Sequence, residues 1–143
     1  MKPYERQASV RWLGTRHRGK ATAAGSAQQM TLCPKRSDLK RRGVNPTELL
    51  AAAHAGSFSL SLANELAEAG FQPKQIDTTA TITMELKAQG WILARVHLDV
   101  TARVPKTAEC DFVDAALQAK AHCPISLALN ANISMRAKLI RKL

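Results

Sequence analysis

The side chains in this sequence that could do redox chemistry are its three cysteines, Cys33, Cys110 and Cys123. No two of them form a CxxC pair, and no Cys and His spacing resembles that of a structural zinc site. Pro124 directly after Cys123 predicts a helix start, whose positive end favours a thiolate over a thiol. The pattern predicts free thiols, and it leaves Cys123 as either a redox residue or an inert, half-buried one.

A second candidate pair is His54 and Ser57, which share one face of a helix because they lie three residues apart. A serine beside a histidine suggests a hydrolase, but the sequence offers no orienting carboxylate and no GxSxG elbow. We therefore interpret His54 as a packed histidine. His122 and Cys123 are adjacent and would need distant partners to bind a metal, so we expect neither a metal nor a cofactor.

Positive charge is concentrated in the first third of the chain. The net charge is +10, and residues 1–45 hold 11 Lys and Arg against 2 Asp and Glu, whereas residues 46–143 hold 10 against 9. A basic run at 35–42 is compatible with a polyanion partner. No zinc finger or RNA-recognition signature is present, and aromatic residues make up only 4%. These features favour a solvated loop and argue against nucleic-acid binding.

Length and composition indicate one folded domain over residues 1–143. The chain is 45% apolar, which argues against disorder. No apolar run reaches the length of a membrane span, and the first residues, MKPYERQASVRW, lack the apolar segment of a secretory signal. We expect a cytoplasmic protein without a membrane partner.

The longest predicted element is a helix from Asn45 to Gly70. Asn45 suits the N-cap, Pro46 suits the first turn, and Gly70 suits a left-handed residue that closes the helix. Its first half is apolar on almost every side, which predicts a helix enclosed by protein. Its small residues also predict close packing against another backbone or the lining of a site.

The remaining elements follow from alternation and helical spacing. Strands are predicted at 4–13, 20–24, 28–33, 74–87, 91–104 and 131–143, and helices at 109–122 and 124–129. The basic segment 34–44 shows no periodicity. In the helix at 109–122 we expect Phe112, Ala116, Leu117 and Lys120 to share a face. Strands and helices are partly segregated, which predicts an α+β fold with an antiparallel sheet.

Two motifs in order, NPTELLAAAHAGSFS at 45–59 and AKAHCPIS at 119–126, are joined by the strand opening IDTTA at 76–80 and by LNA at 129–131. In these motifs the chain resembles the OsmC/Ohr family of thiol-dependent hydroperoxide peroxidases, and its OsmC branch in particular. The similarity spans roughly 11–139. It implies an OsmC-like fold, with antiparallel sheets around a long buried central helix. It also implies an intertwined homodimer with two active sites at the interface.

The family chemistry that the resemblance implies is attack of a thiolate on the peroxide O–O bond, followed by condensation of the sulfenic acid with a second thiol. An arginine stabilises the thiolate and a glutamate holds the arginine. Carried over to this sequence, the second thiol is Cys123, but the reactive-cysteine position is Ser57 and the glutamate position is Thr47. The arginine position falls on Ser37 without gaps, with Arg36 beside it as the first candidate and Arg41 or Arg42 as alternatives after a small shift.

These departures affect both geometry and function. Ten residues of straight helix rise about 15 Å, so the family geometry predicts a break at Gly56 or around His54 that brings Thr47 and Ser57 together. A serine forms no anion near neutral pH and cannot be oxidised as a thiol is.

The resemblance therefore implies a member of a peroxidase family, in oxidative or osmotic stress defence, with a degenerate site. Its partners would be an organic hydroperoxide and a dithiol reductant, with any remaining activity carried by Cys123. The alternative is a non-catalytic dimeric scaffold that binds a small apolar or anionic ligand in the interface pocket.

Overall fold

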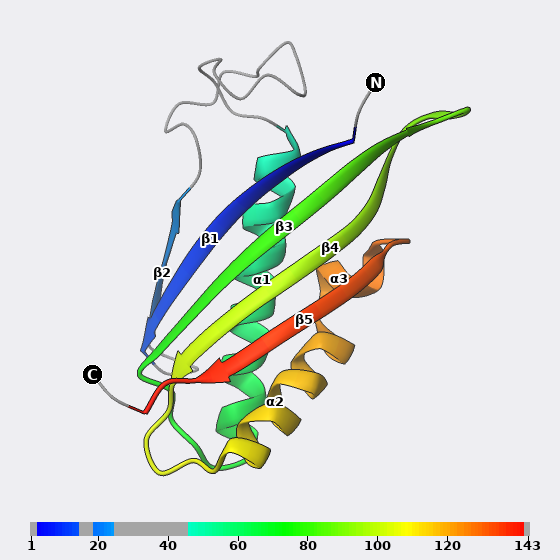
Figure 1. Cartoon of the computed structure of the whole chain (residues 1–143). Helices are drawn as coiled ribbons and strands as arrows, with labels where there is room; N and C mark the ends of the chain where they lie inside the picture. The colour runs from blue at the N-terminus through cyan, green and yellow to red at the C-terminus, as the bar shows by residue number, and fades with distance from the viewer. Residues whose placement is uncertain (1–2, 15–18, 25–45, 142–143) are drawn as a thin grey trace.

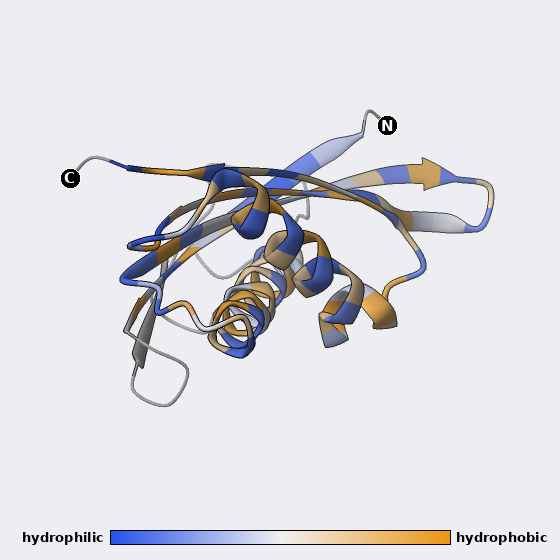
Figure 2. Ribbon diagram, turned by 90° about the horizontal axis from the view of Figure 1, so that it is seen from below, coloured by the Kyte–Doolittle hydropathy of each residue, from blue (hydrophilic) through white to orange (hydrophobic). Residues whose placement is uncertain are grey.

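The computed structural model of the chain describes residues 3–14, 19–24 and 46–141. Within them, one five-stranded sheet carries helices on one face only, as the two orthogonal views show (Figures 1 and 2). In chain order the elements are β1 (Tyr4–Gly14), β2 (Gly19–Ala24), α1 (Pro46–Glu68), β3 (Gln75–Lys87), β4 (Gly90–Arg103), α2 (Glu109–His122), α3 (Pro124–Ala128) and β5 (Asn132–Leu139). The α+β class is therefore confirmed. Asn45, Cys33, Arg36 and the predicted strand at 28–33 lie outside the described residues.

The strand order is β2-β1-β3-β4-β5, and the sheet is mixed. The pairs β1–β2, β1–β3 and β3–β4 are antiparallel, whereas β5 runs parallel to β4. The prediction of purely antiparallel sheets around a helix is wrong for this chain. The physical reason lies in the connection, because α2 and α3 carry the chain back to the starting end of β4, and such a crossover yields a parallel neighbour.

The side chains of β3 alternate regularly between its two faces from Gln75 to Ile82, and beyond that Thr83 is buried and Leu86 is exposed. Ile76, Thr78, Ala80 and Ile82 are buried toward the helices. A register shift between Thr83 and Met84 marks a bulge in the β3–β4 pair. The core lies between the sheet and the helices, and its largest members are Phe58, Phe112, Leu62, Leu66, Ile76, Ile82 and Leu98.

Helix α1 is continuous from Pro46 to Glu68, so the predicted break at Gly56 or around His54 is wrong. A Cβ atom added at Gly56 would meet only a Val10 methyl at 4.0 Å, so nothing in this chain interrupts the backbone there.

The C-terminal end of α1 is as predicted. Gly70 has φ +90°, its amide donates to Ala67 O, and the Phe71 amide donates to Leu66 O. These two bonds satisfy the last carbonyl groups of the helix in a Schellman arrangement.

Burial of α1 is one-sided in the single chain. The side facing the sheet is buried, including Ala51, Ala55, Phe58 and Leu62. The opposite side is open, with Leu49 exposed to 39% and Leu60 to 45%. The prediction of a helix enclosed by protein is thus met on one side only within one chain.

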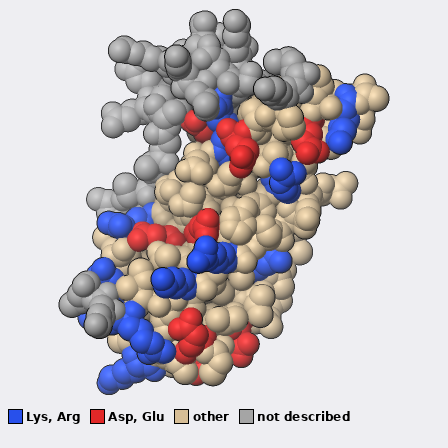
Figure 3. Space-filling view, viewed as in Figure 1, with Lys and Arg blue, Asp and Glu red and all other residues tan. Residues whose placement is uncertain are grey.

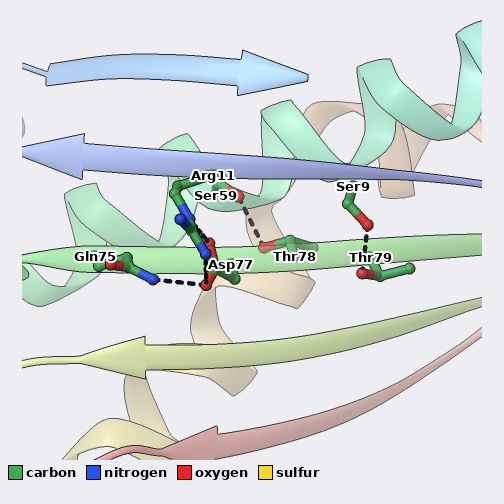
Figure 4. A network of polar contacts seen from close by, with 7 residues as sticks. All are labelled: Ser9, Arg11, Ser59, Gln75, Asp77, Thr78 and Thr79. Atoms are coloured by element: carbon green, nitrogen blue, oxygen red, sulfur yellow. Dashed lines mark hydrogen bonds and ion pairs between the residues drawn. The ribbon is translucent and has the colours of Figure 1, made fainter. Parts of the chain in front are cut away.

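A buried hydroxyl pair joins α1 to the middle of the sheet. Ser59 Oγ lies 2.8 Å from Thr78 Oγ1 and also donates to Ala55 O at 2.8 Å. Figure 4 shows Ser59 reaching from the helix to β3. Because Ser59 donates to Ala55 O, its oxygen is free to accept from the buried Thr78 hydroxyl, and this bond ties the helix to the strand.

On the face of the sheet away from the helices, β1 and β3 are joined by polar pairs. Arg11 Nε donates to Asp77 Oδ1 at 2.8 Å, and the Ser9 and Thr79 hydroxyls are 2.7 Å apart (Figure 4). These contacts account for the polar alternate positions of β3.

Helix α2 has the predicted bounds but a shifted buried face. Phe112, Ala115, Ala116 and Ala119 are buried, whereas Leu117 is 52% exposed, so its predicted place on the packed face is wrong. Small residues allow α2 to lie close to α1. None of the described helices is both long and apolar enough to cross a membrane.

Candidate functional site

Cys123 is the residue around which the candidate site is built. It joins α2 to α3, and Pro124 takes the first position of α3 because its fixed φ suits a helix start. The side chain is fully buried against α1. The thiol is free, as is that of Cys110, which is exposed at the other end of α2. Fourteen helical residues span about 20 Å, so these two thiols cannot meet within one chain.

His54 on α1 contacts the first turn of α3. Its Nε2 atom lies 2.8 Å from Ser126 Oγ, and its ring is fully buried. Among the described residues, its Nδ1 atom has no hydrogen-bond partner. The imidazole is packed in the interior, as the sequence indicates, and it also contacts a hydroxyl next to a thiol.

Ser57 lies one helical turn beyond His54, on the side of α1 that faces Cys123. Its Oγ atom is 3.5 Å from Cys123 Sγ, within hydrogen-bond range for sulfur. The (i, i+3) spacing of His54 and Ser57 places both side chains against one sulfur atom.

The electrostatics of this cluster favour ionisation of the thiol. Burial alone raises the pKa of Cys123, but the neighbouring imidazole of His54, the hydroxyl of Ser57 and the amide and hydroxyl of Ser126 oppose this rise. Their combined effect lowers the pKa from 9.0 to about 6. A thiol with that pKa is about nine-tenths thiolate at pH 7, and the thiolate is the nucleophilic form of cysteine.

The other predicted site residues are not brought to Cys123. Thr47 lies in the first turn of the straight helix α1, so ten residues separate it from Ser57 by about 15 Å along the axis. Arg36 lies outside the described residues. The prediction that Thr47 and Ser57 meet within one chain is therefore wrong, because the helix does not bend.

His122, next to Cys123 in sequence, points elsewhere. Its Nδ1 atom is 3.3 Å from Glu65 Oε1 on the exposed side of α1. Within 3–14, 19–24 and 46–141, no three His, Cys, Asp or Glu side chains form a group that could hold a metal ion.

For two members of the cluster, His54 and Ser126, the sequence alone did not predict a functional role. The available signal was the pairing of an (i, i+3) His and Ser on one helix with a Cys-Pro-x-Ser helix start on another. Only the packing of α1 against α3 unites the two patterns.

Known proteins share this sequence pattern and fold. Residues 38–138 match the family model described as OsmC-like protein. The chain is 33% identical over 137 residues to "Peroxiredoxin OsmC" of Escherichia coli (strain K12), with 94% of this chain and 96% of that protein covered.

Two solved structures share the fold. An OsmC-like protein from Mycoplasma pneumoniae has a TM-score of 0.68 and 16% identity, covering 85% of this chain and 89% of that one. The organic hydroperoxide resistance protein OhrB of Bacillus subtilis has a TM-score of 0.58 and 19% identity, covering 93% and 97%. Because the family model matches residues 38–138 and the Escherichia coli relative is 33% identical over nearly the whole chain, this chain belongs to the OsmC-like protein family.

Proposed function

We propose that this protein reduces organic hydroperoxides through the thiolate of Cys123, as a one-cysteine member of its family. The observation that carries the proposal is the lowered pKa of Cys123, about 6, within hydrogen-bond reach of Ser57. The relative named a peroxiredoxin and the fold neighbour named for hydroperoxide resistance agree with this reaction class.

In the proposed reaction, the Cys123 thiolate attacks the terminal oxygen of the hydroperoxide. The S–O bond forms as the O–O bond breaks, the alkoxide takes a proton from water, and the sulfur becomes a sulfenic acid. A dithiol reductant then condenses with the sulfenic acid and releases water. The second thiol of the reductant then attacks this mixed disulfide. The attack releases Cys123 as a thiolate and converts the reductant into an intramolecular disulfide.

Ser57 has a supporting role in this proposal. Family resemblance assigns it the reactive-cysteine position, where a hydroxyl cannot attack peroxide. At 3.5 Å from Cys123 Sγ it can instead donate a hydrogen bond to the thiolate. Cys123 has no second thiol beside it among the described residues, and the proposal therefore uses an external dithiol as reductant.

Peroxide access requires opening of the α3 turn, because Cys123 is fully buried. Helix α3 has five residues and none of them is buried, and Leu127 is 70% exposed. A short segment with so little buried surface opens at low free-energy cost. The opening exposes the sulfur while α1 keeps His54 and Ser57 in place.

The direct test is turnover of cumene hydroperoxide by the purified chain with dithiothreitol as reductant. Cys123→Ala should abolish turnover and Cys110→Ala should leave it unchanged. Mass spectrometry after one equivalent of peroxide, with a sulfenic-acid trap, should label Cys123. Turnover that survives in Cys123→Ala, or an unmodified Cys123 together with no turnover, would exclude this mechanism.

We also propose that the single domain assembles as a homodimer through the open side of α1. Leu49 and Leu60 are large apolar side chains exposed there, with Ala53 between them, and burial of such a stripe favours association. Light scattering should give twice the mass of one chain, and Leu60→Glu should give the mass of one. The monomer mass for the unaltered protein would contradict this assembly.

The alternative function is a dimeric scaffold that binds a small apolar or anionic ligand without turnover. The complete burial of Cys123 favours it over catalysis. Native mass spectrometry of the purified dimer should then detect a co-purified small molecule, and Cys123→Ala should retain it. Hydroperoxide turnover that depends on Cys123 would decide against this alternative.

A further inference from the structure

Two adjoining cavities lie at the end of the sheet where β4 and β5 finish, far from Cys123. The first has a volume of about 240 Å³ and is lined by residues of the β4 and β5 ends together with Lys74. The second, of about 650 Å³, is lined by 70–74 with Pro105 and Lys106. Lys74, Pro105 and Lys106 line both cavities, so the two adjoin one another and are together called the hollow.

The charges around the first cavity all have one sign. Lys74, Arg103, Lys106 and Arg141 line it, and no Asp or Glu is among the described residues that line either cavity. Figure 3 shows several Lys and Arg side chains at the lower left, on the side where β5 finishes in Figure 1, with acidic side chains further to the right. Four like charges around one hollow repel one another, and a bound anion relieves that repulsion.

Arg103 gives a second, independent observation. Its Nε atom is buried and has no hydrogen-bond partner among the described residues. A buried donor without an acceptor is costly, and planar guanidinium groups pair with carboxylate or phosphate in a two-pronged manner. The backbone of Lys106 adds to this, because its φ of +60° is unusual for a residue with a Cβ atom and such strain is concentrated at binding sites.

Apart from Gln72, the remaining lining of the two cavities is apolar. Val104 and Leu139 are buried, and Pro105 lies between the two cavities. An inorganic ion would use the cations and leave these walls without a partner. A ligand with an anionic group and an attached hydrocarbon part would use both.

The hollow is separate from the Cys123 cluster. Strand β5 has eight residues and runs from beside α3 to the cavity, a length of about 25 Å. From Ser57 to Gly70, thirteen residues of α1 and its end span about 20 Å. A ligand in the hollow cannot touch Cys123.

We propose that this hollow binds a small organic anion, whose carboxylate or phosphate group pairs with Arg103 and the neighbouring lysines and whose apolar part lies on Val104, Pro105 and Leu139. The site is independent of the proposed peroxidase reaction, so each can be tested without the other.

The test is calorimetric titration of the full chain at low salt with three probes: hexyl phosphate, hexanoate and inorganic phosphate. Hexyl phosphate or hexanoate should bind saturably, and the tighter of the two identifies the anionic group. Inorganic phosphate should bind about tenfold more weakly than hexyl phosphate, because it makes no apolar contact. Equal affinity for inorganic and hexyl phosphate, or no saturable binding of either organic probe, would overturn the proposal.

Matched variants locate the site. Arg103→Gln combined with Lys106→Gln should weaken binding at least tenfold, whereas Lys87→Gln combined with Arg136→Gln removes the same charge elsewhere and should change it less than twofold. An equal loss of affinity in both double variants would mean that only the net charge of the protein matters for binding, and it would overturn the proposal.

Amide chemical shifts of the unaltered protein give a readout that does not depend on the folding of a variant. Hexyl phosphate should shift the amide signals of Lys74, Arg103 and Lys106, and leave those of Cys123 and Ser126 in place. Shifts confined to Cys123 and Ser126 would overturn the proposal.

Discussion

The Sγ atom of Cys123 lies 3.5 Å from the Oγ atom of Ser57, across the contact between α3 and α1. The two residues are 66 positions apart in sequence, and each depends on its own helix for position. One hydroxyl and one thiol thus share a site in which His54 and Ser126 supply further polar groups that lower the pKa of the thiol.

Replacing Ser57 by cysteine should create a disulfide. The 3.5 Å between Ser57 Oγ and Cys123 Sγ must shorten to about 2.05 Å, a shift that small rotations of both side chains can supply. Addition of cumene hydroperoxide to Ser57→Cys should remove two free thiols and lower the mass by about 2 Da.

Ser61→Cys provides the control for that disulfide, because it places the thiol one turn further along α1, about 6 Å away. It should keep its thiols under the same conditions. Persistent free thiols at 57 and 123 in oxidised Ser57→Cys would show that the two side chains do not face each other.

Removing the imidazole should raise the pKa of Cys123. His54 is the largest of the groups that lower this pKa, and a hydrogen bond to a charged group contributes about 1.5–3 kcal/mol, or roughly one to two pKa units. The rate of alkylation by iodoacetamide, measured against pH, should give a midpoint near 6 for the unaltered protein and a higher one for His54→Gln.

His97→Gln, on the opposite face of the sheet, should leave the midpoint of Cys123 alkylation unchanged. Cys33 and the exposed Cys110 must both be replaced by alanine in all of these variants, so that only Cys123 is observed. An unchanged midpoint in His54→Gln would mean that the imidazole does not act on the sulfur.

The same pKa shift predicts how stability depends on pH. Between pH 6 and 9 the folded protein holds Cys123 as thiolate while the unfolded chain keeps the proton, so the free energy of unfolding rises with pH. The stabilisation is present above pH 9 and is lost as the pH falls through 6. We expect a gain of about 2–4 kcal/mol across this window relative to Cys123→Ala.

Urea unfolding of both proteins at four pH values measures this difference. Parallel pH profiles for the unaltered protein and Cys123→Ala would contradict a lowered pKa.

Gly56→Ala should stabilise the protein. A Cβ atom at this position meets only Val10 Cγ2, at the ordinary contact distance of 4.0 Å. Alanine is favoured over glycine in a helix by about 1 kcal/mol. Thermal unfolding should show a higher midpoint for Gly56→Ala. A lower midpoint would show that a second chain approaches the backbone there, as the small residues of α1 would permit.

The buried hydroxyl pair of Ser59 and Thr78 should behave non-additively. Ser59→Ala leaves the Thr78 hydroxyl without its partner and should cost about 1–3 kcal/mol of unfolding free energy. Thr78→Val removes that hydroxyl, so the double variant should cost less than the sum of the two single changes. A cost equal to the sum, in urea unfolding of all four proteins, would mean that the hydroxyls do not interact.

Local sequence signals were sufficient for most individual elements. Pro46 and Gly70 bracket α1, alternation identifies β3 and β4, and Cys123-Pro124 separates α2 from α3, all in agreement with the structure. Such signals act over a few residues, through backbone geometry and through burial of every second or every third to fourth side chain. The presence of two motifs in the order typical of the OsmC/Ohr family also indicated the family, and the comparisons confirm it.

Tertiary structure alone decided how those elements combine. The parallel pairing of β5 with β4 depends on which end of the sheet the α2–α3 connection returns to, and no local signal encodes that choice. The sequence also indicated only a packing role for His54, and the family resemblance predicted a break in the helix near Gly56. In the structure α1 is straight, Thr47 stays remote, and Ser57, His54 and Ser126 meet Cys123 because two helices pack side by side. The residue types were readable in the chain, whereas the lowered pKa of the thiol arises from contacts across more than sixty positions, which only folding brings into range.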